Sequence, residues 1–227
     1  MKWKPLMTRL FSAIALAILL ALSLSFPSTA APITRTPTVS ANNTKAAQLS
    51  AEQRAVRKFY TSLKSVMEDG QKIGFEGRYK ILDPVVRETF DMKNMTRYAA
   101  GFAWMKTPPS EQQELIEAFT RFSIATYASR FPKNDGELFE VLGEKSLKDG
   151  NKIVETTLTT KDGKVVQLNY LMTRDREKAH VMDVYLNGTI SELATRRADF
   201  TAVIRSNGVK GLIKMLDDKV TNMKKKG

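Results

Sequence analysis

The residue whose type and setting best suit acid–base chemistry is Asp183. It lies in the segment His180–Leu186, where side chains alternate in the period-two pattern of a β-strand. Burial there would raise the pKa of the carboxyl group, and Tyr170 or Tyr185 could share a cavity with it, as in some proton-abstracting sites. Asp183 could instead pair with an arginine or accept a hydrogen bond from a backbone amide. Because one carboxylate is a weak indicator of catalysis, the sequence favours the structural role.

Few other residues could support catalysis or bind a metal. The chain has one histidine, His180, and no cysteine. One imidazole cannot build a zinc or iron site alone, and the usual pairs of nucleophile and base are missing. Gly70, Gly74 and Gly77 are not followed by the Lys-Ser/Thr of a phosphate-binding loop. We therefore expect no metal, no cofactor, no disulfide and no enzymatic activity.

The segment His180–Phe200 must position Asp183, because it joins a strand to a helix through one tight turn. Asn187-Gly188 ends the strand, since both residues tolerate the positive φ of such a turn. Thr189-Ile-Ser-Glu192 has the spacing of a capping box, which predicts the start of a helix. Arg196-Arg197 lies on that helix. The join therefore mixes fixed charge with apolar surface, as the lip of a pocket would.

Amphipathic helices precede and follow this segment, with apolar residues at three- and four-residue spacing. Caps, Pro and Gly predict where they begin and end. In chain order, we expect a helix from the capping box Ser50–Gln53 to Asp69-Gly70, a short helix from Asp83-Pro84, a helix from Asp91 to Gly101, a long helix from the box Ser110–Gln113 to Pro132, and a last helix after Asn207-Gly208.

Between the long helix and His180–Phe200 the apolar period changes to two. This predicts four strands, at Leu138–Leu142, Lys152–Thr160, Lys164–Thr173 and Lys178–Leu186. Asp162-Gly163 is typical of a hairpin turn, and consecutive strands with such short turns must be antiparallel. Helices first, a meander next and helices last indicate an α+β fold, with helices from both the N-terminal and C-terminal parts covering an antiparallel sheet of about four strands.

The N-terminal segment indicates export. Basic residues precede the apolar run Leu10–Leu24, which is shorter than a spanning helix, and small residues follow it. We expect a cleaved signal peptide over 1–30, a flexible tether over 31–49, one domain over 50–222 and a basic tail over 223–227. Removing the three basic residues of the first segment lowers the net charge from +12 to +9. An exported basic surface favours anionic lipid or an acidic protein over nucleic acid as its partner.

Several motifs together resemble the MlaC family, the periplasmic toluene-tolerance auxiliary proteins of a phospholipid-trafficking ABC system. The resemblance runs from about Leu49 to the C-terminus and rests on Arg78-Tyr-x-x-Leu-x-Pro84, Phe90-Asp-x-x-x-Met95-x-Arg97, Gly101-x-x-Trp104, Gln113, Phe119, Tyr127, Asn169-Tyr-Leu-Met172, Asp183-Val-Tyr-x-x-Gly188-x-x-x-Ser191, Arg197, Phe200 and Gly208. The runs 122–131 and 183–197 look closest to the hopanoid-biosynthesis-associated branch.

This resemblance implies a monomeric periplasmic carrier whose curved sheet and helices enclose an apolar cavity for the acyl chains of a phospholipid or a hopanoid. It implies an inner-membrane ABC transporter complex, an outer-membrane lipoprotein complex and transient membrane contact as partners. Side chains expected to line the cavity are Phe90, Met95, Tyr98, Phe102, Trp104, Phe119, Phe122, Tyr127, Tyr170 and Met172. Those expected near the head group or a partner, or paired internally, are Arg78, Arg97, Arg196 and Arg197.

Three alternatives stay open from the residues alone. The apolar side chains expected to line a cavity could be plain core, because a filled and a hollow core have the same pattern. The chain could be a small enzyme of the cone-shaped α+β type that uses Asp183 on a hydrophobic substrate. It could also be a ligand-free periplasmic module that docks on a membrane transporter through its basic surface.

Overall fold

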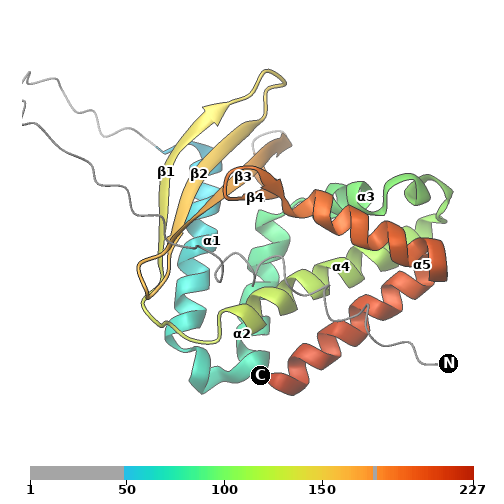
Figure 1. Ribbon diagram of the computed structural model, residues 1–227, viewed down its shortest axis with the longest axis horizontal. Helices are drawn as coiled ribbons and strands as arrows, with labels where there is room; N and C mark the ends of the chain where they lie inside the picture. The colour runs from blue at the N-terminus through green and yellow to red at the C-terminus, as the bar shows by residue number, and fades with distance from the viewer. Residues whose placement is uncertain (1–48, 176–177) are drawn as a thin grey trace, which may run out of the picture. The chain divides into compact units, whose positions relative to one another are not determined.

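A computed structural model describes residues 49–175 and 178–227, which form one compact unit (Figure 1). The predicted signal peptide and all but the last residue of the predicted tether lie outside these ranges. The helices of the described chain are α1 (Ala51–Glu68), α2 (Gly70–Thr89), α3 (Met92–Ala100), the 3₁₀ helix η3 (Gly101–Lys106), α4 (Pro109–Arg130) and α5 (Glu192–Lys226). None of them is both long and apolar enough to cross a bilayer.

The strands form one antiparallel meander in the order β1-β2-β3-β4-β5. Their bounds are β1 (Leu138–Ser146), β2 (Lys152–Thr159), β3 (Val165–Asp175), β4 (Lys178–Leu186) and β5 (Ile190–Ser191). The α+β fold and the four longer strands were predicted correctly. The two-residue β5 was not, because Thr189–Glu192 carries the pattern of a helix cap. Two β-bulges shift the register of the sheet. One is in β1 at Leu142, and the other is in β4 at Met182, opposite Leu171 and Met172 of β3.

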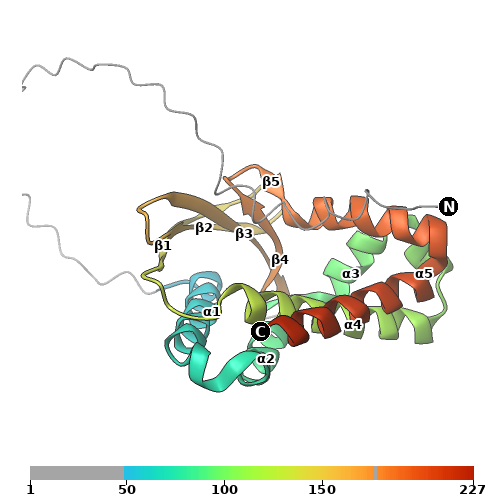
Figure 2. The ribbon, with the colours of Figure 1, turned by 60° about the horizontal axis from the view of Figure 1, so that its bottom comes forward.

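The sheet packs one face on α1, and the buried side chains between them form the main core (Figure 2). A Ser50 capping box starts α1, as predicted, with the Ser50 side chain accepting from the Gln53 amide. The fully buried residues on α1 include Val56, Phe59, Leu63 and Met67, and those on the sheet include Val154, Tyr170, Met172 and Val181.

Helix α5 consists of two arms. Gly208 has a φ of 69°, a conformation that favours glycine, and it separates a first half (192–207) from a second half (209–226). The first half runs from β5 away from the sheet beside α3, and the second half returns along α4 towards α2 (Figure 2). The predicted basic tail is the last turn of this second half, where Lys224 pairs with Glu76 at 2.7 Å.

The prediction of a short helix starting at Asp83-Pro84 is wrong, because both residues lie inside the longer helix α2. The chain bends at Gly74, where φ is 61°, and then stays helical through Pro84 to Thr89. Its buried residues Phe75, Leu82 and Val86 continue one apolar face across the proline. Burial of that face outweighs the local tendency of proline to end a helix.

Two predicted capping boxes are also wrong. Helix α4 begins at Pro109 after Pro108, and the predicted cap Ser110 lies inside its first turn. The side chain of Gln112 instead donates to the carbonyls of Trp104 and Thr107, which ties α4 to η3. Helix α5 is capped by Ser191 rather than Thr189, because β5 extends the sheet for two residues past the turn.

Candidate functional site

Asp183 is buried at the join between β4 and α5, with 6% of its surface exposed. Its Oδ1 atom accepts from the amides of Val184 at 2.7 Å and Leu193 at 2.9 Å. Its Oδ2 atom accepts from the hydroxyl of Ser191, and the same Ser191 oxygen accepts from the Ala194 amide at 2.8 Å. The carboxylate and Ser191 therefore satisfy two of the orphan amides at the start of α5.

This geometry gives Asp183 the structural role that the sequence favoured. Both carboxylate oxygens are already acceptors for groups of the protein, so the side chain is held as part of a helix cap. The nearby phenol of Tyr185 has a raised pKa, mainly through burial and partly through the charge of Asp183. Neither the contacts of Asp183 nor the raised pKa of Tyr185 assigns a catalytic role to these residues.

The ten side chains predicted to line a cavity separate into three groups by burial. Phe90, Phe119, Phe122, Tyr170 and Met172 are buried. Met95, Trp104 and Tyr127 are partly buried against the same core. Tyr98 and Phe102 lie on the surface, with 42% and 70% of their area exposed. The last two are therefore not positioned as the interior wall of a cavity.

Several of the buried side chains meet in an aromatic cluster between the sheet, α1 and α4. The ring of Phe59 lies 5.2 Å from that of Phe90 and 5.1 Å from that of Tyr127, both near edge-to-face. Tyr60 continues the cluster to Tyr170, with 5.8 Å between ring centroids. Phe59 and Tyr60 were absent from the predicted lining, because their position on the α1 face indicated core and nothing more specific.

The tyrosines in this cluster are neutral. Burial raises the pKa of Tyr60 to about 12, and it also raises the pKa values of Tyr127 and Tyr170. The Thr156 hydroxyl donates to the carbonyl of Leu168, so in the 2.7 Å contact between Tyr60 and Thr156 the phenol is the donor. The cluster is therefore apolar surface interrupted by uncharged hydroxyls.

Arg78 does not reach a head group or a partner. Only 3% of it is exposed, and its guanidinium donates to the carbonyls of Ala128 at 2.8 Å and Gly70 at 2.6 Å. Burial lowers its pKa. The side chain joins α2 to the end of α4, so of the roles left open by the sequence it takes internal pairing.

The other three predicted arginines are at or near the surface. Arg97 is exposed on α3. The guanidinium carbon of Arg197 lies 5.0 Å from the ring centroid of Tyr98, so this pair packs on the outside of the α3–α5 contact. The guanidinium carbon of Arg196 lies 5.4 Å from the ring of the buried Phe122, so Arg196 faces α4. Only Arg196 therefore adjoins the predicted apolar residues of the interior.

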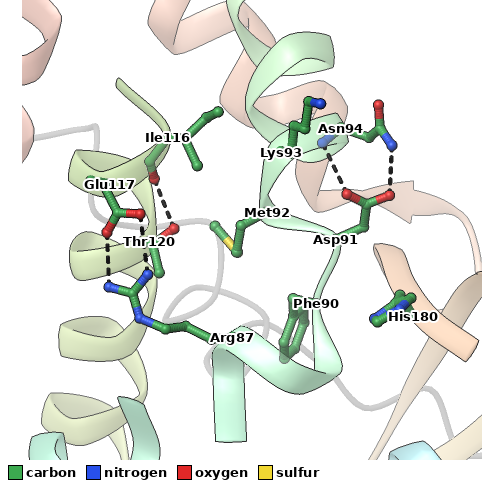
Figure 3. Close-up of a pocket in the computed structure, with 10 residues that line it drawn as sticks. All are labelled: Arg87, Phe90, Asp91, Met92, Lys93, Asn94, Ile116, Glu117, Thr120 and His180. Carbon is green, nitrogen blue, oxygen red and sulfur yellow. Dashed lines mark hydrogen bonds and ion pairs between the residues drawn. The ribbon is translucent and has the colours of Figure 1, made fainter. Parts of the chain in front are cut away.

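A separate pocket of about 480 Å³ lies between α2, the start of α3, α4 and β4 (Figure 3). Phe90 is the one predicted cavity residue that lines it. Its rim carries an ion pair between Arg87 and Glu117 at 2.9 Å, and it also includes His180. The ring Nδ1 of His180 is 3.1 Å from the Glu88 carbonyl, which can only accept, so this nitrogen carries a proton. The polar groups of this pocket are largely paired with the protein itself.

Comparison with known proteins identifies a family and a similar solved structure. A model of the MlaC protein family matches residues 57–218. Among solved structures, the fold is similar to that of the phospholipid-binding protein from Ralstonia solanacearum, solved in complex with a phospholipid. The similarity has a TM-score of 0.66 at 21% identity and covers 77% of this chain and 99% of that chain. No curated protein sequence matches.

Proposed function

Because the chain belongs to the MlaC family, we propose that it is a lipid carrier that holds the acyl chains of a phospholipid between its sheet and its helices. The observation that carries this proposal is the aromatic cluster around Phe59, Phe90 and Tyr127, in a fold shared with a protein that was solved with a phospholipid bound. A small enzyme acting through Asp183 has no comparable support, since that carboxylate is a helix cap.

The physical demand on such a carrier is the transfer of hydrocarbon out of water. Each Å² of acyl-chain surface exposed to water costs about 25 cal/mol, so binding in an apolar interior is favourable without any chemical step. Neutral phenols suit this task, because they leave no charge to be desolvated by the chains. Phe119, Phe122 and Met172 extend the apolar surface available to them.

We also propose that the protein works in the periplasm after removal of residues 1–30. There it would pass lipid, as a monomer, between an inner-membrane ABC transporter complex and an outer-membrane lipoprotein complex. Transient membrane contact is supported by η3, which exposes 70% of Phe102 and 79% of Met105 beside a cation, Lys106, 4.9 Å from the Phe102 ring. Exposed aromatic and thioether groups next to basic side chains suit an anionic membrane surface.

Native mass spectrometry of the mature protein purified without detergent, followed by solvent extraction, tests the carrier. We expect one phospholipid per chain. A stoichiometric hopanoid would keep the carrier but change its cargo. A lipid-free mass that is unchanged after incubation with phospholipid vesicles would refute the carrier and favour a ligand-free docking module.

A further inference from the structure

The pocket of Figure 3 and the aromatic cluster share one wall, the ring of Phe90. In the cluster, the centroid of this ring lies 5.2 Å from that of Phe59 and 5.9 Å from that of Tyr127. Only 5% of Phe90 is exposed. Because the rings of the cluster are packed against one another, a hydrocarbon chain can pass from the pocket into the cluster only if the Phe90 ring moves.

The pocket offers hydrocarbon surface, and most of its charged groups are paired within the protein. Its apolar lining residues are Phe90, Met92 and Ile116. At its rim, Arg87 of α2 and Glu117 of α4 form an ion pair at 2.9 Å. The two carboxylate oxygens of Asp91 accept from the amide and the side chain of Asn94, at 3.1 Å and 2.7 Å. The pocket therefore suits the end of an acyl chain better than a charged head group.

The backbone around Phe90 is fixed to the sheet by hydrogen bonds. The amide of Asp91 donates to the carbonyl of Val181 on β4 at 2.9 Å. The ring Nδ1 of His180, also on β4, donates to the Glu88 carbonyl at 3.1 Å. Moving this crossing of α2 and β4 would break both bonds. Turning the Phe90 ring breaks no hydrogen bond and loses only the contacts of the ring with its neighbours.

We propose that this pocket is the portal through which an acyl chain enters and leaves the interior, and that the ring of Phe90 is its gate. This inference rests on the proposed carrier function and adds the route that the cargo takes. With the ring in its present position, the portal is closed to the cluster. When the ring turns, the surfaces of Phe59 and Tyr127 become accessible from the pocket. A chain in the pocket would then replace the contacts that the ring loses.

The test measures how fast loaded protein releases phosphatidylglycerol that carries a pyrene-labelled acyl chain. Release to an excess of unlabelled phosphatidylglycerol vesicles is followed by stopped-flow fluorescence, and native mass spectrometry gives the occupancy at equilibrium. We expect Phe90→Leu protein to release lipid about fivefold faster, the factor expected when one edge-to-face ring contact is lost from the closed gate. Its occupancy should stay close to that of wild type, because a gate changes the rates of entry and release together.

Ile116→Trp tests the opposite change. Ile116 lines the pocket from α4 and is only partly buried, so the larger side chain would occupy the pocket and narrow the portal. We expect this variant to release lipid several-fold more slowly than wild type. Faster release in Phe90→Leu protein and slower release in Ile116→Trp protein cannot both come from a general loss of stability.

Each variant has a matched control that makes the same substitution away from the pocket. Phe200→Leu is the control for the gate, since Phe200 is 2% exposed and its ring lies edge-to-face with another ring at 5.1 Å. Ile213→Trp is the control for the portal, since Ile213 is partly buried on α5 and does not line the pocket. Both controls should release lipid at the wild-type rate.

Three results would overturn the inference. Release at the wild-type rate from either Phe90→Leu or Ile116→Trp protein would refute the gated portal while leaving the carrier intact. Equal acceleration in Phe90→Leu and Phe200→Leu protein would do the same, because it would show a general loosening of the core. Wild-type protein that takes up no lipid would refute the carrier itself, and the portal with it.

Discussion

Replacing Asp183 with alanine is predicted to destabilise the fold without any involvement in chemistry. The buried Leu193 amide would lose the Asp183 oxygen that accepts its hydrogen bond, at a cost of about 1–3 kcal/mol for an unsatisfied buried donor. Ser191 would lose the group that orients its hydroxyl, which weakens a helix cap worth about 1 kcal/mol. The bond from Val184 adds a smaller amount. The total is about 3–4 kcal/mol, a large part of a typical stability of about 5–15 kcal/mol.

Thermal unfolding of lipid-free protein, followed by circular dichroism, measures this change. For a domain of this size each kcal/mol shifts the melting temperature by about 2–4 °C, so Asp183→Ala should melt roughly 10 °C below wild type. Asp183→Asn keeps an acceptor for the two amides and should lose about half as much. Asp218→Ala is the control, since its side chain is 59% exposed and pairs with the exposed Lys214, an interaction worth little.

Two outcomes would refute the reasoning on Asp183. An alanine variant that melts within about 2 °C of wild type would show that the carboxylate is not a significant cap. An asparagine variant that keeps full stability but loses a measurable turnover of a hydrophobic substrate would restore the enzyme hypothesis.

Two further predictions concern charge and the surface. Glu52 is buried, and although burial opposes its ionisation, hydrogen bonds and the charges of its basic neighbours give it a lowered pKa. It therefore stabilises the fold above the ordinary pKa of about 4.3, and this contribution is lost as the pH falls through its folded-state pKa. Glu52→Gln should lower the unfolding free energy by about 2 kcal/mol at pH 7, and denaturant titrations should show the difference fading in acid. Phe102→Ser with Met105→Ser should reduce co-sedimentation with anionic vesicles several-fold. Leu142→Ser, at a site 62% exposed on β1, should not, and an equal loss in both would contradict membrane contact through η3.

The sheet was predictable from sequence because its signals are local. Asn187 and Gly188 adopt φ values of 50° and 75°, and Gly163 adopts 78°, as their turns require. Cap signals were less reliable, since a cap competes with other partners for the same amides. The helix α5 begins after Ser191 rather than after Thr189, because Ile190 and Ser191 first pair with β4. Pro84 failed to begin a helix because tertiary burial continued across it.

For the candidate site, the sequence could predict which side chains are buried but not how they are arranged. Periodicity identified Phe119 and Phe122 as inward-facing, and both are buried. It could not show that Phe102, next to a helix end, faces solvent on η3. Nor could it single out Lys219, since lysine and arginine are common throughout this basic chain and only the fold brings this side chain near Phe122.

The approach of Arg196 and Lys219 to the ring of Phe122 depends on two features of the backbone. Arg196 and Lys219 lie in one helix but on opposite sides of Gly208, whose positive φ turns the second half of α5 back along α4. The first half is fixed to the sheet by the Asp183 cap, and Arg196 follows one turn after that cap. A side chain at position 208 would be strained in this conformation, which would displace Lys219 from Phe122 without altering any cation. The residue that first suggested acid–base chemistry thus holds in place the start of the helix that carries Arg196.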